Sequence, residues 1–299
     1  MGKKTIVYKQ DGELCITRLI TFRCNNKCIS CIADREEHFQ QRDPSLKKLK
    51  WIFKKCSPNA TTIDLNGGEP TLREDLFELL LFLKNRFRNS TIQLLTNARM
   101  FSIKEYCRNF VELDLQPFNF LITLYGHNAK VHDAVTRTQK SFVQTTKGIR
   151  NLLNNNQNIE IRLVINKLNY KHIIDMVEYV AKNFPTIFRL AIINLKLTGE
   201  AEKNKKLVIV PYEKIVPSVV KALQLHSDKV NIELFHFPKC ILPEKFRKFA
   251  RGLTMPKNQA KFATFCKNCM ENTNCSGLWN GYVDYYGFKD LKLIKDEEK

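Results

Sequence analysis

Short apolar runs alternate with amphipathic patterns through the first 226 residues of this 299-residue chain. The runs are rich in Ile, Leu, Val and Thr, which predicts strands, and the patterns between them predict helices. Strands that alternate with helices predict an α/β fold with a parallel sheet. We expect strands near 14–22, 61–66, 91–96, 119–125, 159–165 and 187–193, and helices near 45–56, 73–87, 102–110, 141–155, 170–183 and 211–226.

Composition excludes several classes of protein. Apolar residues make up 43% and charged residues 26%, which is ordinary globular usage and argues against a disordered chain. No apolar run approaches the roughly 18 residues that a membrane span needs. The first 15 residues, MGKKTIVYKQDGELC, lack the apolar core of a secretory signal. We therefore expect a cytoplasmic protein with no membrane partner.

The net charge of +19 comes from 49 Lys and Arg against 30 Asp and Glu. Such an excess often marks a nucleic-acid partner. Here the basic residues are scattered. In the segment SLKKLKWIFKKC, for example, Leu49 and Phe53 share the apolar face of a helix while the lysines occupy the other face. We therefore favour an acidic peptide or a small substrate over a nucleic acid.

The ten cysteines carry most of the functional information. In a chain without an export signal they argue against disulfides, because the cytosol keeps thiols reduced. Three of the ten, Cys15, Cys56 and Cys107, lie in apolar or helical patterns and are predicted core residues. The remaining seven are clustered, which predicts metal sites: Cys24, Cys28 and Cys31 form C-x3-C-x2-C, and Cys266, Cys269 and Cys275 form C-x2-C-x5-C, with Cys240 upstream.

The first cysteine group offers three thiolates, one fewer than a structural zinc site needs. A 4Fe–4S cluster held by three cysteines keeps one iron open to an external ligand, which is a catalytic arrangement. The group also follows a predicted strand directly, and α/β barrels carry their chemistry on loops at the carboxyl ends of strands. About 40 residues later, Gly67-Gly68 follow the next predicted strand, where glycine allows a close backbone approach to a ligand.

These two motifs, CNNKCISC and NGGEPT, together resemble those of radical S-adenosylmethionine (SAM) enzymes. The resemblance covers about residues 14–226 and implies a partial (β/α)6 TIM-like barrel. It implies that Cys24, Cys28 and Cys31 hold a 4Fe–4S cluster whose open iron binds SAM. The SAM contacts that it implies are Gly67, Gly68 and Glu69 for the amine, and Asn97, Thr123 and Arg162 at strand ends for the ribose and carboxylate.

Two details qualify this resemblance. The family often has an aromatic residue before the third cysteine, where this chain has Ser30. We therefore expect Phe22 or Ile32 to pack against the adenine instead. His132-Asp133 lies in a segment that many relatives share, and we interpret it as a capping or packing pair rather than an acid–base pair.

After residue 226 the alternation is expected to stop, which divides the chain into an N-terminal segment (1–13), a barrel (14–226) and an irregular Cys-rich domain (227–299). By themselves, four cysteines suit either zinc or an iron–sulfur cluster. The domain resembles the twitch or SPASM-type extensions of radical SAM maturases, above all those of His-Xaa-Ser peptide systems. That resemblance implies one auxiliary 4Fe–4S cluster, held by Cys240, Cys266, Cys269 and Cys275.

The resemblance implies an enzyme that cleaves SAM reductively to a 5′-deoxyadenosyl radical, which then abstracts hydrogen from the substrate. An auxiliary cluster would accept the substrate electron, so we expect an oxidation, with a flavodoxin or ferredoxin-type electron donor. The favoured substrate is a ribosomally synthesised peptide. Because the first predicted strand begins near residue 14, we expect a separate leader-peptide-binding protein or use of the barrel's own surface. Dehydrogenation of a sugar or aminoglycoside-like molecule and RNA modification remain as alternatives.

Overall fold

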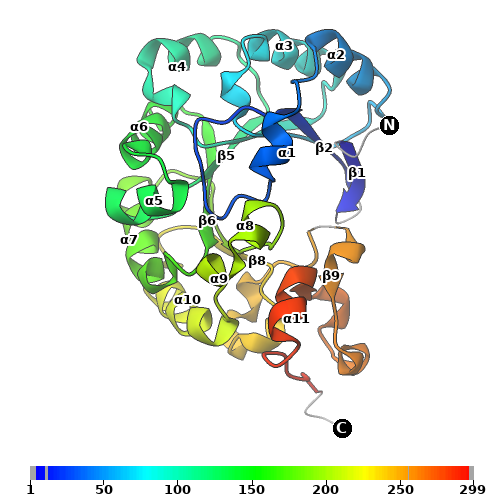
Figure 1. Cartoon of the computed structure of the whole chain (residues 1–299), viewed down its shortest axis with the longest axis vertical. Coiled ribbons are helices and arrows are strands. Elements are labelled where there is room, and N and C mark those ends of the chain that lie inside the picture. Colours follow the sequence, from blue (N-terminus) through cyan, green and yellow to red (C-terminus); the bar gives the residue numbers. More distant parts are fainter. Residues whose placement is uncertain (1–4, 11–12, 255, 296–299) are drawn as a thin grey trace.

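The main feature of the computed structural model, which describes residues 5–10, 13–254 and 256–295, is one eight-stranded sheet. The strands follow one another in sequence order from β1 to β8. β1 (Thr5–Gln10) is antiparallel to β2 (Glu13–Thr21), and all later neighbours are parallel. Figure 1 shows the sheet curled into an open barrel with the helices around its outer side.

Strand–helix units build this barrel. The remaining parallel strands are β3 (Thr62–Gly67), β4 (Thr91–Thr96), β5 (Phe118–Thr123), β6 (Asn158–Ile165), β7 (Arg189–Asn194) and β8 (Ile232–Phe235). The covering helices are α2 (Leu46–Lys54), α3 (Leu76–Arg86), α4 (Lys104–Val111), α6 (Ser141–Leu153), α7 (Ile173–Asn183) and α10 (Tyr212–His226). Shorter helices lie in the loops after β2, β5 and β7: α1 (Arg35–Phe39), α5 (Ala129–Thr136), α8 (Glu200–Lys203) and α9 (Lys205–Val208).

The α/β class and the partial barrel with a Cys-rich C-terminal extension are confirmed, and the six expected strands are β2 to β7. The boundary expected between residues 226 and 227 does not coincide with the end of the sheet, because β8 pairs in parallel with β7. β8 has only four residues and is followed by an irregular segment, so its sequence gives a weak strand signal.

The two faces of the sheet differ in polarity, as period-2 alternation requires. On β6, Ile161 and Leu163 are fully buried in the hydrophobic core beneath the helices. Glu160 and Arg162 alternate with them and contact each other on the opposite face, inside the barrel. The barrel therefore has an apolar outer layer that holds the fold together and a charged interior that can contact a polar ligand.

The C-terminal module is built from 3-10 turns, the short pair β9 (Ala260–Lys261) and β10 (Leu278–Trp279), and α11 (Asn280–Tyr286). Trp279 Nε1 donates to the Asn194 carbonyl at 3.2 Å, and the Tyr282 hydroxyl accepts from the Tyr212 N–H at 3.1 Å. These contacts attach the module to the end of β7 and the start of α10. Within the described residues, no helix combines the length and apolarity that a bilayer span requires.

Candidate functional site

The first cysteine group lies on the loop that follows β2, at the carboxyl end of the strand. Backbone hydrogen bonds hold this loop against α5: the Lys27 N–H donates to the Thr136 carbonyl at 3.0 Å, and the Ile29 N–H donates to the Val135 carbonyl at 2.9 Å. The structure thus places Cys24, Cys28 and Cys31 where the sequence predicted them, on the catalytic edge of an α/β barrel.

The two glycines after β3 pack against the start of this cysteine loop. A Cβ on Gly68 would lie 2.1 Å from the Arg23 carbonyl oxygen, and one on Gly67, whose φ is +147°, would lie 2.3 Å from the Thr21 oxygen. The Glu69 N–H donates to the same Arg23 carbonyl at 2.7 Å. The close approach that we expected toward a ligand is therefore, in the structure, an approach of two backbone segments.

Glu69 is 1% exposed, and both oxygens of its carboxylate accept hydrogen bonds from the protein. Oε1 accepts from the Thr71 N–H (3.2 Å) and from the hydroxyls of Thr71 and Thr96 (2.6 Å each), while Oε2 accepts from the Asn97 N–H (2.7 Å). Burial raises the pKa of Glu69, and the hydrogen bonds oppose that shift by favouring the ionised form. The side chain ties the end of β3 to the end of β4.

Asn97 connects the end of β4 to the cysteine loop. Its amide Nδ2 donates to Asn25 Oδ1 at 2.7 Å, between the first and second cysteines. Arg99 adds a second connection, because its guanidinium donates to Asn26 Oδ1 at 2.8 Å and to the Asn25 carbonyl. The sequence predicted Asn97 at this site but gave no indication of Arg99.

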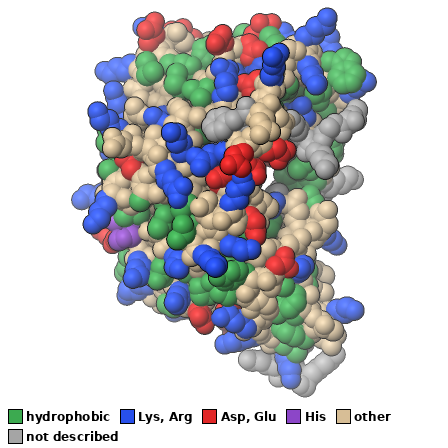
Figure 2. Space-filling model, viewed as in Figure 1, with side chains coloured by type: hydrophobic (Ala, Val, Ile, Leu, Met, Phe, Trp, Pro, Cys, Tyr) green, Lys and Arg blue, Asp and Glu red, His purple; other side chains and the backbone are tan. Residues whose placement is uncertain are grey.

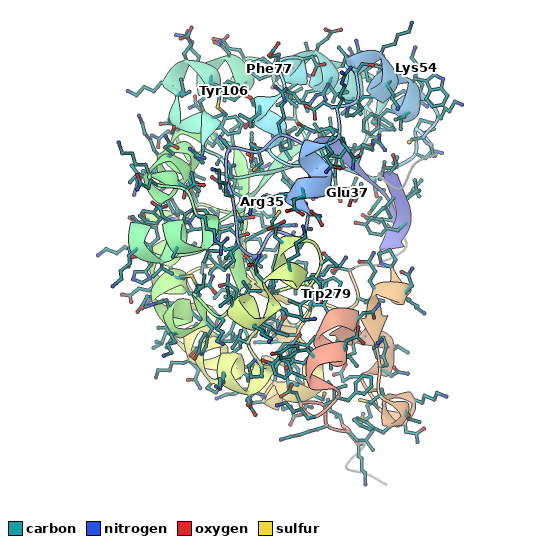
Figure 3. The ribbon with its side chains drawn as sticks, viewed as in Figure 1. Arg35, Glu37, Lys54, Phe77, Tyr106 and Trp279 are labelled. Carbon is teal, nitrogen blue, oxygen red and sulfur yellow. The ribbon has the colours of Figure 1, made fainter. Side chains whose placement is uncertain are left out.

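The loop after β7 supports the cysteine loop from a third side. The Ala201 N–H donates to the Cys31 carbonyl at 2.9 Å, and the Thr198 hydroxyl donates to the Ile32 carbonyl at 3.0 Å. Arg35 of α1 pairs with Glu200 of α8 at 3.2 Å. In Figure 3, Arg35 and Glu37 lie beside the central opening of the barrel, whereas Lys54, Phe77 and Tyr106 lie on the outer helices.

Burial dominates the electrostatics of the three thiols. It raises the pKa of Cys24 to about 12 and also raises the pKa values of Cys28 and Cys31. The Asn26 N–H donates to Cys24 Sγ at 3.4 Å. Bound iron would lower these pKa values, because a metal ion favours the thiolate that ligates it. Three half-buried thiols on one loop held by hydrogen bonds fit an iron–sulfur cluster.

Tyr125 is a site residue that the sequence reasoning missed. It lies two residues beyond β5, and burial raises its pKa, with further contributions from the nearby Cys28 and Cys31 thiols. Its side chain lies near Ser30, the residue that departs from the family pattern. The available signal was an aromatic residue at a strand end, in the run LITLYG.

The two residues expected to pack against adenine differ in environment. Ile32 is 61% exposed. Phe22 is buried, packs edge-on against His38 with ring centroids 5.1 Å apart, and lines a cavity of about 680 Å³. That cavity is also lined by Thr17 and Leu19 of β2 and Asn66 of β3, so it opens from the barrel interior. Figure 2 shows the molecular surface notched on the side where the N-terminal hairpin and the C-terminal module face each other.

Thr123 and Arg162 are register partners on β5 and β6, and both are half-buried. Arg162 Nε lies 2.6 Å from Glu160 Oε1, and Arg189 pairs with the other oxygen of that carboxylate. Although burial of Glu160 favours the neutral acid, the two guanidinium groups bring its pKa below its usual range. Arg162 is therefore held by an ion-pair network inside the barrel, with Thr123 beside it.

The four C-terminal cysteines, Cys240, Cys266, Cys269 and Cys275, line a single small cavity. The Lys292 N–H donates to Cys240 Sγ at 3.4 Å. Four thiols around one cavity can bind either a zinc ion or an iron–sulfur cluster.

The remaining residues that the sequence singled out have structural environments. Cys15 and Cys107 are buried in the protein, and Cys56 is half-buried. His132 is buried and accepts a hydrogen bond from the Tyr125 N–H at 3.1 Å, and burial lowers its pKa to about 4. Asp133 caps α6 by accepting from the Phe142 N–H at 2.8 Å. Both members of the pair pack and cap, as the sequence suggested.

Comparison with known families decides the identity of the barrel. The profile of the Radical SAM superfamily matches residues 19–180, more than half of the chain, including the cysteine loop and the glycine turn. The chain belongs to the radical SAM superfamily. Membership implies SAM and one 4Fe–4S cluster as cofactors, and the loop with three half-buried thiols fits that cluster.

Individual relatives of this radical SAM protein are distant. It is 27% identical over 151 residues to mycofactocin maturase MftC of Mycolicibacterium smegmatis, which covers 48% of this chain and 35% of MftC. It is 22% identical over 285 residues to the Fe-coproporphyrin III synthase of Methanosarcina barkeri, covering 94% of this chain and 68% of that one. Streptococcus suis SuiB bound to S-adenosylmethionine has a similar fold, with a TM-score of 0.57 and 17% identity over 84% of this chain and 54% of SuiB.

Proposed function

We propose that this radical SAM enzyme is a maturase that oxidatively modifies a ribosomally synthesised peptide. The observation that supports this most is the cavity lined by four cysteines in a module attached to the barrel. A relative named as a maturase, mycofactocin maturase MftC, supports the maturase activity. So does the fold of SuiB, which has been solved with its precursor peptide SuiA and has a TM-score of 0.58 to this chain at 19% identity.

At the first site, Cys24, Cys28 and Cys31 would hold the 4Fe–4S cluster to which SAM binds. Bound there, the cluster and SAM would together supply the radical chemistry that removes a hydrogen atom from the substrate. Around it, this chain's residues would orient SAM: the backbone of Gly67 and Gly68, the side chains of Asn97, Thr123 and Arg162, and Glu69.

Glu69 has a different role from the others in this proposal. Its carboxylate already accepts four hydrogen bonds from the protein, so it would act on SAM by fixing the position of Asn97 and the glycine turn. Tyr125 replaces the aromatic surface that Ser30 does not provide, because its ring lies beside the cysteine loop. Phe22, which lines the cavity open to the barrel interior, supplies the second aromatic face.

At the second site, Cys240, Cys266, Cys269 and Cys275 would hold an auxiliary 4Fe–4S cluster. Four protein ligands complete the coordination of such a cluster, so its proposed task is to accept the substrate electron. The substrate would thereby be oxidised, for example by forming a crosslink. A flavodoxin or ferredoxin-type protein is the proposed donor to the first cluster.

One observation favours a second candidate function, oxidation of a small molecule. The Fe-coproporphyrin III synthase, whose name gives a small-molecule product, aligns with 94% of this chain and with the C-terminal module included. On the face that Figure 2 shows, the basic residues are spread among acidic and apolar ones, so this face gives no support for an RNA substrate.

The proposal is tested in two stages on anaerobically reconstituted protein. Dithionite-reduced enzyme with SAM should yield 5′-deoxyadenosine, and S-adenosylhomocysteine or methylthioadenosine as the sole product would exclude this chemistry. Co-expression with the short reading frames beside the gene should then give a peptide whose mass falls by an even number of hydrogens. If none of these peptides changes mass while a small carbonyl or alcohol substrate is turned over, the second candidate function is correct.

A further inference from the structure

The loop after β7, residues 195–201, contacts both cysteine-bearing parts of the molecule. Toward the first site, Thr198 and Ala201 hydrogen-bond the backbone at Ile32 and Cys31. Toward the C-terminal module, Leu197 packs so closely on Gly281 that a Cβ there would lie 2.8 Å from the Leu197 Cβ. A group bound on this loop is therefore near both proposed clusters.

Lys196 is the cation on this loop, and it projects onto the C-terminal module. Its Nζ lies 5.2 Å from the centroid of the Trp279 ring and donates to Gln259 Oε1 at 2.6 Å. The His236 ring, which directly follows β8, packs on the same indole with centroids 4.0 Å apart. We call Lys196, His236, Gln259 and Trp279 the Lys196 cluster. The ends of β7 and β8 place it on the catalytic edge of the sheet.

The positions of these side chains are fixed by the fold. Trp279 is 6% exposed, and its indole N–H is held by the Asn194 carbonyl at 3.2 Å. Figure 3 shows Trp279 at the junction between the barrel and the C-terminal module, across the opening from Arg35 and Glu37. His236 has a φ of +62°, which is strained for a residue with a Cβ. Such strain is typically retained at functional positions, where the surrounding structure enforces it.

The Lys196 cluster carries an uncompensated positive charge. Arg162 and Arg189 inside the barrel share the carboxylate of Glu160, but among the described residues no carboxylate lies within ion-pair distance of Lys196. Burial lowers the pKa of Lys196. Burial first, and then Lys196 and Arg162, lower the pKa of His236 to about 3, so the imidazole is neutral and can donate one N–H.

We propose that the Lys196 cluster binds a carboxylate of the substrate, with the Lys196 ammonium as the charged anchor and His236 as a neutral donor. Among the residues that the structure describes, the amide of Gln259 is the hydrogen-bond partner of this half-buried ammonium, and an anion would complete its hydrogen bonds. The carboxylate comes from an Asp or Glu side chain or from a chain terminus. The source of the carboxylate in a peptide rests on the proposed function. The binding of a carboxylate by this cluster rests on the geometry alone.

The test uses anaerobic isothermal titration calorimetry of the cluster-loaded full chain. The probes are N-acetyl-aspartate N-methylamide, which offers a side-chain carboxylate, N-acetyl-alanine, which offers a terminal one, and the neutral N-acetyl-asparagine N-methylamide. We expect at least one acid to bind about tenfold or more tightly than the neutral amide, which corresponds to about 1.4 kcal/mol. The better acid identifies the source of the carboxylate.

Variants assign the binding to this cluster. Lys196→Met keeps most of the stem that packs on Trp279 but removes the charge, so it should abolish the preference for acid over amide. Lys196→Arg should retain the preference, and Lys214→Met, at an exposed position on α10, should leave it unchanged. Equal absorbance of the clusters in all variants is the control for folding.

Three results would overturn the inference: equal affinity of the wild-type protein for acid and amide, an unchanged preference in Lys196→Met, or tighter binding of inorganic phosphate than of either acid. The first and third results are measured on the wild-type protein, so they remain decisive even if a substitution prevents folding. Peptide turnover is not measured, so the failure of the peptide proposal and the failure of carboxylate binding are separate outcomes.

Discussion

Replacement of Glu69 by Gln should destabilise the protein, because this buried carboxylate joins three segments of the site. Its Oε1 accepts three hydrogen bonds and its Oε2 accepts one, from the Asn97 N–H at 2.7 Å. A glutamine fits best with its oxygen at the Oε1 position, which leaves its NH2 group facing the Asn97 N–H. One buried donor then has no acceptor, at a cost of about 1–3 kcal/mol.

The other three hydrogen bonds lose the assistance of the negative charge, which roughly doubles the strength of such bonds. That loss of about 0.5–1 kcal/mol each is partly offset, because the variant no longer buries a charge. We therefore expect Glu69→Gln to lower the free energy of unfolding by about 3 kcal/mol, or to lower Tm by roughly 6–10 °C.

The assay is thermal unfolding of the cluster-loaded protein at pH 7.5, followed by circular dichroism. Glu78→Gln is the matched control, because Glu78 has a side chain that is 64% exposed and pairs only with Lys50 on the surface. Its Tm should change by about 1–2 °C at most, as expected for an exposed ion pair. Equal Tm values for Glu69→Gln and wild type would show that Glu69 is a neutral acid in the folded protein, and would refute this account of the glycine turn.

Three further predictions concern the cysteine loop, the auxiliary site and pH. Gly68→Val should lower both stability and SAM affinity, measured by Tm and equilibrium dialysis, because even its Cβ would lie 2.1 Å from the Arg23 oxygen. The variant Cys269→Ala should still release 5′-deoxyadenosine but fail to form the oxidised product, provided that gel filtration shows an intact barrel. Undiminished formation of the product would exclude an electron-acceptor role for the auxiliary cluster. In the folded protein the pKa of His132 lies near 4, below its ordinary 6.5. The free energy of unfolding should therefore reach its full value above pH 6.5 and fall by up to about 3 kcal/mol as the pH drops to 4. Tm measured across this pH range should fall less in His132→Gln than in the wild type.

The sequence predicted the fold well where the signal is local. Strands β2 to β7 have apolar runs with clear turns between them, and the two motifs fall on adjacent strand ends. Strand β8 was not predicted, because four residues are too few to show the alternation of apolar and polar residues that marks a strand. Its place in the sheet depends on pairing with β7. The antiparallel strand β1 was not predicted, because it lies before the first strong apolar run of the sequence.

The candidate site was predictable for the residue types whose spacing carries chemistry. Cys24, Cys28, Cys31 and the glycine turn are of this kind. The partners that hold them are not, because Arg99, Tyr125 and Ala201 reach the cysteine loop from about 70 to 170 residues away in sequence. The role of the glycines depends on tertiary structure, because the Arg23 backbone that packs against Gly68 is about 45 residues away in sequence.

We propose that this chain holds two 4Fe–4S clusters, one on three cysteines and one on four. The most direct measurement is iron and acid-labile sulfide per chain after anaerobic reconstitution, combined with Mössbauer spectroscopy. Wild type should hold about eight iron atoms, and the variant in which Cys24, Cys28 and Cys31 are all Ala should keep about four as one 4Fe–4S cluster. A triple variant that holds no iron, with one zinc ion per chain in the wild type, would contradict the account.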